Sequence, residues 1–158
     1  MNRQKSRINA PQTVIMDPCG VCNLRCPLCP AGTSKLRPGR GEMPFEMFKA
    51  IADKLPKPKL MALYNWGEPF LNPHIFEMIR YAKGKSARVR IDTNFSFVKP
   101  DDFFYSIIET GLDFLVVSLD GASQETYSKY RIGGDFGLVT ENIKKLLRFD
   151  KEAGRVAP

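Results

Sequence analysis

The segment TVIMDPCGVCNLRCPLCP, residues 13–30, joins a short apolar run to closely spaced cysteines. Residues 13–17 have the pattern of a short buried strand. All four cysteines of the chain follow it, at Cys19, Cys22, Cys26 and Cys29. A disulfide scaffold would spread its cysteines along the chain to close long loops. Clustered cysteines in a reducing cytoplasm usually bind metal, so the segment predicts a metal or iron–sulfur site directly after the first strand.

The cysteine spacing leaves two kinds of site open. A single zinc ion could take all four thiolates, although zinc ribbons usually place a long loop between two C-x2-C pairs, and here only three residues separate them. Without Cys19, the spacing is Cys22-x3-Cys26-x2-Cys29. Three thiolates on a cubane cluster leave one iron without a protein ligand, and an open coordination position is typical of a catalytic metal site.

Strand-like and helix-like segments alternate along the rest of the chain. Apolar and alternating runs predict strands at residues 13–17, 60–66, 88–94 and 113–120. Between and after them, helical patterns begin at Pro44, Asn72, Pro100 and Ser123, and a last helix ends near Gly154. This alternation indicates an α/β fold of parallel strands with crossover helices.

The length and the ends of the chain set the domain prediction. Residues 1–12 form a basic N-terminal extension, and residues 13–158 form one core domain with 43% hydrophobic residues in the whole sequence. Four βα units cannot close a barrel, because six units of about 30 residues would need roughly 190 residues. The last six residues, AGRVAP, resemble the approach to a fifth strand. We therefore expect a fragment, or a protein that ends early.

Charge and hydropathy narrow the classes of partner. The net charge is +7, from 24 basic and 17 acidic residues, and the densest basic runs, 54–59 and 83–90, carry no interleaved aromatic residues. We read them as a solvated surface and expect no nucleic-acid partner. No apolar run suited to a signal peptide or a membrane span follows the basic N-terminus. Together with the clustered cysteines, this predicts a cytoplasmic protein without a membrane partner.

Four motifs, in order, resemble those of the radical S-adenosylmethionine (radical SAM) enzymes. The segment CNLRCPLC (22–29) resembles the family's cluster motif, and WGEP (66–69) is similar to its GGEP motif after the second strand. IDTN (91–94) resembles the end of the third strand. SLDGASQETYSKYRIGGDF (118–136) resembles the SPASM-type branch of sulfatase-maturing and peptide-modifying enzymes. The resemblance implies a partial (β/α)6 radical SAM barrel with about four of its strands present.

The resemblance also implies a reaction and its partners. Cys22, Cys26 and Cys29 would ligate a [4Fe-4S] cluster, whose fourth iron binds the amino and carboxylate groups of S-adenosylmethionine. One-electron reduction would cleave S-adenosylmethionine to methionine and a 5′-deoxyadenosyl radical, which abstracts hydrogen from an unidentified substrate. A reduced flavodoxin or a ferredoxin-type protein would supply the electron. A peptide or protein is among the candidate substrates of this branch.

Further residues match family positions near S-adenosylmethionine. The resemblance assigns the methionine amino group to Gly67 and Glu68, because glycine allows close approach of the backbone and a carboxylate suits an ammonium group. It assigns the ribose and carboxylate end to Ser118 and Arg131, and it places Leu28 of the cysteine loop near adenine. Trp66, in place of the family's first glycine, is assigned to packing. The predicted S-adenosylmethionine contacts are Gly67, Glu68, Asn94, Ser118, Asp120, Arg131 and Leu28.

Cys19 has no place in the three-cysteine pattern. We interpret it as a packed spare thiol, since an isolated cysteine is usually buried as a small apolar residue. The alternative is a non-catalytic iron–sulfur or metal-binding module in which Cys19 is the fourth ligand and closes the site. The predicted strand ends favour the enzyme, because functional groups in βα barrels gather at the carboxyl ends of the strands.

Overall fold

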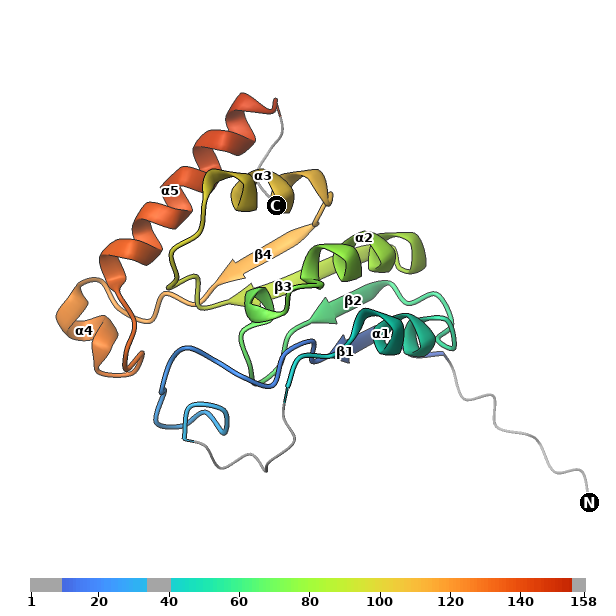
Figure 1. Cartoon of the computed structure of the whole chain (residues 1–158), viewed down its shortest axis with the longest axis horizontal. Coiled ribbons are helices and arrows are strands. Elements are labelled where there is room, and N and C mark those ends of the chain that lie inside the picture. Colours follow the sequence, from blue (N-terminus) through green and yellow to red (C-terminus); the bar gives the residue numbers. More distant parts are fainter. Residues whose placement is uncertain (1–9, 34–40, 155–158) are drawn as a thin grey trace, which may run out of the picture.

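A computed structural model describes residues 10–33 and 41–154, and in these residues four parallel strands form one sheet. Their order in the sheet is the order in the chain, and Figure 1 shows their carboxyl ends pointing the same way. The parallel α/β arrangement is as predicted. The strands are β1 (Thr13–Met16), β2 (Leu60–Leu63), β3 (Arg88–Thr93) and β4 (Phe114–Val117).

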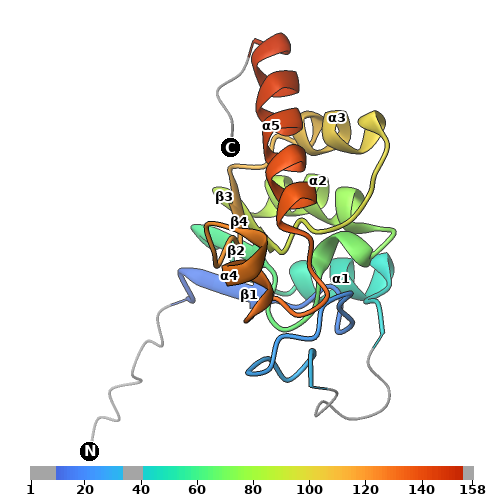
Figure 2. The same cartoon turned by 90° about the vertical axis from the view of Figure 1, so that its left-hand side faces the viewer.

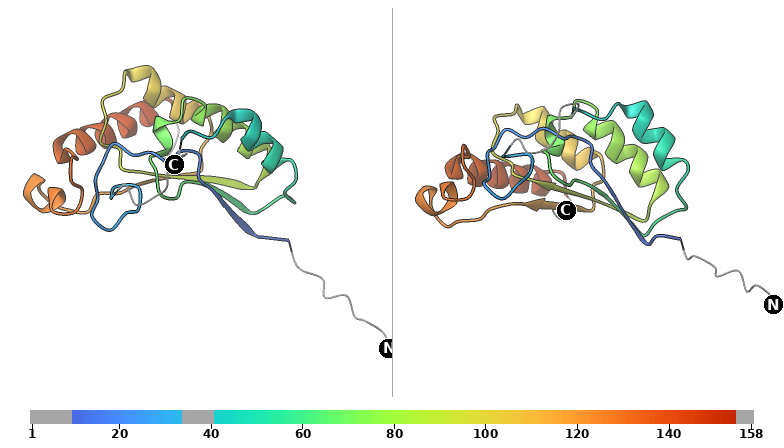
Figure 3. Two further views of the ribbon diagram at one scale, coloured as in Figure 1. Left: turned by 60° about the horizontal axis from the view of Figure 1, so that its bottom comes forward. Right: turned by 90° about the horizontal axis from the view of Figure 1, so that it is seen from below.

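The helices follow the strands at the expected places. Figure 3 shows the long helices on one face of the sheet, whereas α4 lies beyond its carboxyl edge. Most of residues 1–12 and the end of the predicted fifth-strand approach, 155–158, lie outside the described residues. The helices are α1 (Phe45–Ala52), the 3-10 turn η1 (Pro69–Leu71), α2 (Ile75–Lys85), α3 (Asp101–Glu109), α4 (Gln124–Ser128) and α5 (Phe136–Glu152).

Local sequence explains where several helices begin. Pro44 and Pro100 hold the extended backbone just before α1 and α3, and two acidic residues then occupy the first turn of α3. Ser123 caps α4 through its side chain, which accepts a hydrogen bond from the backbone nitrogen of Thr126. Asp135 caps α5 in the same way through the nitrogen of Leu138.

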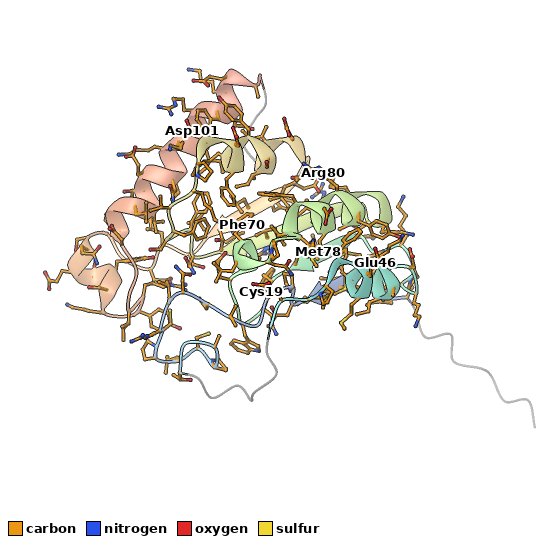
Figure 4. The ribbon with its side chains drawn as sticks, viewed as in Figure 1. Cys19, Glu46, Phe70, Met78, Arg80 and Asp101 are labelled. Carbon is orange, nitrogen blue, oxygen red and sulfur yellow. The ribbon has the colours of Figure 1, made fainter. Side chains whose placement is uncertain are left out.

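The core lies between the sheet and its helices. Alternate residues of the central strands, such as Met61 and Ile91, are fully buried on the helix side. Phenylalanines around α3 add edge-to-face ring contacts, for example Phe70 with Phe103 at 5.1 Å between ring centroids. In Figure 4, Phe70 and Met78 lie inside this layer, whereas the charged side chains Glu46, Arg80 and Asp101 lie outside it.

The opposite face of the sheet has no helix over it in the described part of the chain, as Figure 3 shows. Phe114 and Val116 of β4 are each 38% exposed there, beside the basic side chain of Arg88, whose guanidinium carbon lies 5.5 Å from the ring of Phe114. A groove of about 560 Å³ runs over this apolar and basic surface. This face therefore mixes apolar and charged side chains.

Every strand ends earlier than the sequence predicts, β1 and β3 by one residue and β2 and β4 by three. Residues 64–66 were expected to continue β2, but the chain leaves the sheet after Leu63, and the Trp66 nitrogen donates to Asp17 after β1. β4 likewise ends at Val117, although the prediction extended to residue 120. After β2 and after β4 the chain leaves the sheet at the edge where the cysteine loop lies, and Figure 2 shows this end of the molecule. None of the described helices is both long and apolar enough to cross a membrane.

Candidate active site

The ends of all four strands contribute to one cavity of about 260 Å³ at the carboxyl edge of the sheet. Nine of the ten predicted site residues line it, which means that motifs up to about a hundred residues apart meet here. Asp120 is the tenth, and it lies just outside the lining. The nine residues are Cys22, Cys26, Leu28, Cys29, Gly67, Glu68, Asn94, Ser118 and Arg131.

The three predicted cluster ligands differ in their polar contacts. The Cys22 sulfur accepts hydrogen bonds from the backbone nitrogen of Leu24 at 3.4 Å and from the side-chain amide of Asn94 at 3.5 Å. The Cys26 sulfur accepts one from Arg131 at 3.8 Å. The Cys29 thiol instead donates to the carbonyl oxygen of Trp66 at 3.5 Å. Burial raises the pKa of the Cys22 thiol, against the effect of the backbone N–H of Leu24.

The three cysteine side chains do not meet at one point in the described residues. Among residues 10–33 and 41–154, no three His, Cys, Asp or Glu side chains lie close enough together to hold one metal ion. A cubane cluster takes one thiolate on each iron, so its ligands do not need to meet at one point. N–H groups already donate to two of the three sulfurs, those of Cys22 and Cys26.

Cys19 lies apart from these three cysteines. Its side chain is fully buried, its thiol donates to the carbonyl oxygen of Val21 at 3.6 Å, and its backbone forms an antiparallel bridge with Glu42. Burial raises the pKa of the Cys19 thiol, and the backbone hydrogen bond to Val21 opposes this. Cys19 is not among the residues that line the cavity, so the prediction that it is packed is confirmed.

Glu68 connects the ends of two strands beneath the cavity. It is 1% exposed, and its carboxylate accepts hydrogen bonds from the backbone nitrogens of Phe70 and Asn94 and from the hydroxyl of Thr93. Burial raises the pKa of Glu68 to about 7, and these three donors only partly offset that effect. A carboxyl group with this pKa changes its charge near neutral pH.

Two glycines allow the cysteine loop to pack closely on its surroundings. A Cβ atom on Gly67 would lie within covalent distance of the backbone oxygen of Cys19. A Cβ atom on Gly32 would lie 2.5 Å from the backbone nitrogen of Cys26. Both contacts are with backbone atoms, which cannot turn away as a side chain can. The glycine of the WGEP motif is therefore required by the packing of the cysteine loop against it.

Arg131 and Asp120 form an ion pair at the end of the cavity that β4 supplies. The Arg131 side chain is 19% exposed, and its guanidinium carbon lies 5.4 Å from the ring centroid of Tyr130. Burial alone would lower the pKa of Arg131, but the hydrogen bond and the charge of Asp120 outweigh burial and raise it. Arg131 therefore stays charged beside Cys26. Ser118 directly follows β4 and also lines the cavity, and its backbone nitrogen donates to the carbonyl oxygen of Thr93 at 2.9 Å.

One side-chain prediction is wrong, and another residue is more exposed than a packed residue would be. Trp66 was assigned to packing, yet its side chain is 45% exposed and lines the cavity. The cause is the early end of β2, which turns residues 64–66 out of the sheet. Leu28 also lines the cavity and is 82% exposed, so packing does not account for it.

Sequence reasoning missed the residues that hold the cysteine loop in place. The amide of Asn23 donates to the carbonyl oxygen of Ser96 at 2.7 Å, and the nitrogen of Arg25 donates to the carbonyl oxygen of Ile132 at 2.9 Å. Asp17 accepts from the nitrogen of Trp66 at 3.2 Å. No local pattern signals these contacts, because each joins segments that are far apart in the chain. Asn23, a polar side chain inside the cysteine motif, could have been singled out.

Comparisons with known proteins agree with this arrangement. The family model of the Radical SAM superfamily matches residues 16–154. The tungsten-containing aldehyde ferredoxin oxidoreductase cofactor-modifying protein of Pyrococcus furiosus is 29% identical over 142 residues, which cover 87% of this chain and 38% of that protein. The AdoMet-dependent heme synthase of Methanosarcina barkeri is 29% identical over 144 residues, which cover 90% of this chain and 41% of that protein.

A solved structure shares the fold. The crystal structure of methylornithine synthase (PylB) aligns with a TM-score of 0.65 at 15% identity, over 89% of this chain and 42% of that chain. At this identity the likeness supports the fold only. The chain spans about two fifths of the length of the two curated relatives above.

Proposed function

The chain belongs to the radical SAM superfamily and has part of its barrel fold, and from this premise we propose that it binds a [4Fe-4S] cluster and S-adenosylmethionine. In this proposal Cys22, Cys26 and Cys29 are the three protein ligands of the cluster. When bound and reduced, the cluster supplies the electron that cleaves S-adenosylmethionine to methionine and a 5′-deoxyadenosyl radical, which takes hydrogen from a substrate.

One observation carries this proposal. The three cysteines share a single cavity with polar residues from the ends of the other three strands. A structural metal site would need the thiolates but not the remaining walls. A catalytic site needs both, because binding and orientation of a second molecule are the tasks of the protein in cofactor chemistry.

The cavity walls suit the groups of S-adenosylmethionine. Once ionised, Glu68 places a negative charge in the wall, which complements the methionine ammonium group. Arg131 carries a positive charge suited to the methionine carboxylate, and Ser118 offers a hydroxyl for the ribose. Leu28 and Trp66 are exposed apolar side chains on the same cavity, where a flat adenine ring could cover them.

The proposed reaction requires partners outside this chain. A reduced flavodoxin or a ferredoxin-type protein is the proposed electron donor, in the cytoplasm, where such donors and free thiols persist. The segment 118–136 resembles the peptide-modifying branch, so a peptide or protein is the first class of hydrogen donor to test.

The test is direct. The chain is loaded anaerobically with iron and sulfide, then mixed with S-adenosylmethionine and dithionite, and 5′-deoxyadenosine is measured by chromatography. We expect product from the wild-type chain and none from Cys26→Ala. A cluster-loaded wild-type chain that makes no 5′-deoxyadenosine would contradict the enzymatic proposal.

Cys19 distinguishes this proposal from a closed, non-catalytic site. Its sulfur is buried outside the cavity lining, which argues against a role as fourth ligand. We expect Cys19→Ala to keep its cluster and its product. Loss of the cluster in this variant would favour the closed site, and a colourless zinc-loaded protein would reject both cluster hypotheses.

A further inference from the structure

Two side chains from different strand ends donate N–H groups to the proposed cluster thiolates. Asn94, after β3, donates to the Cys22 sulfur at 3.5 Å. Arg131, after β4, donates to the Cys26 sulfur at 3.8 Å. Both lengths suit hydrogen bonds to sulfur, whose acceptor radius is larger than that of oxygen. Both contacts are made within the protein itself.

The orientation of Asn94 is fixed by its other contacts. Its side-chain oxygen accepts from the nitrogen of Ser96 at 2.8 Å, so its amide nitrogen must face the other way, toward Cys22. That nitrogen also donates to the side-chain oxygen of Asn23 at 2.9 Å. Asn94 is 5% exposed, and its own backbone nitrogen donates to Glu68. The donor that reaches Cys22 is therefore already in place before any ligand binds.

Arg131 is held by a comparable set of contacts. Its Nε and Nη2 atoms pair with the Oδ2 atom of Asp120, and this leaves Nη1 to donate to Cys26. The ring of Tyr130 lies 5.4 Å from the guanidinium carbon. A planar group fixed on two sides cannot turn its third nitrogen freely.

We propose that Asn94 and Arg131 are positioning residues that raise the reduction potential of the cluster by donating N–H groups to Cys22 and Cys26. The inference rests on the proposed function, because it requires the cluster. Reduction adds negative charge that spreads over the sulfurs, and N–H donors stabilise the more negative state. Hydrogen bonds to sulfur and local charge are among the factors that set cluster potentials.

The experiment is a redox titration of the anaerobically loaded full chain, with the paramagnetic signal of the reduced cluster as the readout. Asn94→Leu removes the donor and keeps the number and branching of the side-chain heavy atoms, and Arg131→Gln removes both the positive charge and the planar guanidinium group. We expect the midpoint potential to move to more negative values in each variant and furthest in the double variant. A purely structural role for either residue would not move the midpoint.

Matched controls come from the same chain. Asn142 is also a buried asparagine, 4% exposed, but its amide donates to the carbonyl oxygens of Phe95 and Phe97. Asn142→Leu therefore removes a similar group without touching a cysteine. Arg148→Gln removes the same charge from the exposed side of α5. We expect both controls to titrate at the wild-type midpoint.

The outcomes separate this inference from the proposed function. A wild-type chain that takes up no [4Fe-4S] cluster overturns both. Loaded Asn94→Leu and Arg131→Gln variants with the wild-type midpoint overturn the inference and leave the proposed function standing. If Asn94→Leu does not load, Asn94→Gln, which keeps the amide but moves it by one methylene, replaces it. A lowered midpoint then supports the inference, and an unchanged midpoint or failure of this variant also to load overturns it.

Discussion

The helix-covered core and the cavity at the strand ends lie next to each other, yet different forces hold them. Phe70 and Phe95 pack edge to face or tilted within a cluster of rings, where contact is tolerant of small shifts. Glu68 and Asn94, one or two residues away in the chain, are equally buried but satisfied by hydrogen bonds of defined direction. The core therefore depends on volume, whereas the cavity depends on geometry.

The largest effect is expected from a cavity in the core. Phe104 is fully buried and contacts the rings of Phe95, Phe103 and Phe149. Phe104→Ala should lower the free energy of unfolding by about 3–5 kcal/mol, measured by chemical denaturation. Leu147→Ala, at a position 50% exposed on α5, is the control and should change it by less than about 0.5 kcal/mol. Similar losses in both variants would show that α3 does not anchor the core.

The next effect tests how strictly geometry governs the cavity. In Gly67→Ala the new methyl group would overlap the backbone oxygen of Cys19, so the cysteine loop or the turn after β2 must move. We expect a loss of stability on the order of 3 kcal/mol, at the upper end of overpacking costs. Denaturation and cluster uptake should both be measured. A variant with wild-type stability and wild-type uptake would mean that the loop adapts easily.

A smaller effect should appear in the pH dependence of stability. Because burial raises the pKa of Glu68 from 4.5 to about 7, the folded chain keeps a proton that the unfolded chain releases. The stability from this group is fully present below pH 4.5 and is lost as the pH rises through about 7. The decline between these values should be on the order of 1–3 kcal/mol in the wild type.

Glu68→Gln should remove that decline. The readout is the slope of stability against pH and not the stability itself, because the new amide nitrogen would face the N–H of Asn94 and lower stability at every pH. Glu125→Gln, at an exposed site paired with Lys129, should keep the wild-type slope. Parallel denaturation series from pH 4 to 8 decide the matter. An unchanged slope in Glu68→Gln would mean that Glu68 stays ionised in the folded chain.

The smallest expected effect is a gain in stability. Gly84 lies inside α2, and a Cβ atom there would meet nothing within 4 Å. Gly84→Ala should raise the free energy of unfolding by about 0.5–1 kcal/mol, because alanine restricts the unfolded chain and favours the helix. It is also the matched control for Gly67→Ala, since the same substitution is made where space is free. A loss of stability would show an unseen constraint on α2.

The fold could be predicted from the sequence better than the details of the site. The alternating strands and helices, and the meeting of motifs at the strand ends, follow from local patterns and from the geometry of parallel sheets. The helix predicted to begin at Asn72 was close, since α2 begins three residues later at Ile75. Such local patterns carry their information within a few residues.

The errors and omissions have a common cause. Trp66 was assigned to packing because it stands in place of the family's first glycine, but the chain leaves the sheet before it and its backbone nitrogen donates to Asp17. Asn23 and Gly32 matter through contacts with Ser96 and with the backbone of Cys26. Such roles depend on how loops from separate units meet, and no window of sequence contains that information.

The order of the strands also determines how the protein is assembled as it is synthesised. Each strand from β1 to β4 pairs with the strand that follows it, so a nascent chain can dock its units one after another. The cysteine loop leaves the ribosome with the first unit, but Arg131, which donates to Cys26, follows 105 residues later. During that interval the thiols lack part of their surroundings. The cavity that Arg131 and Cys26 share is therefore complete only after α4 and the loop that follows it have left the ribosome.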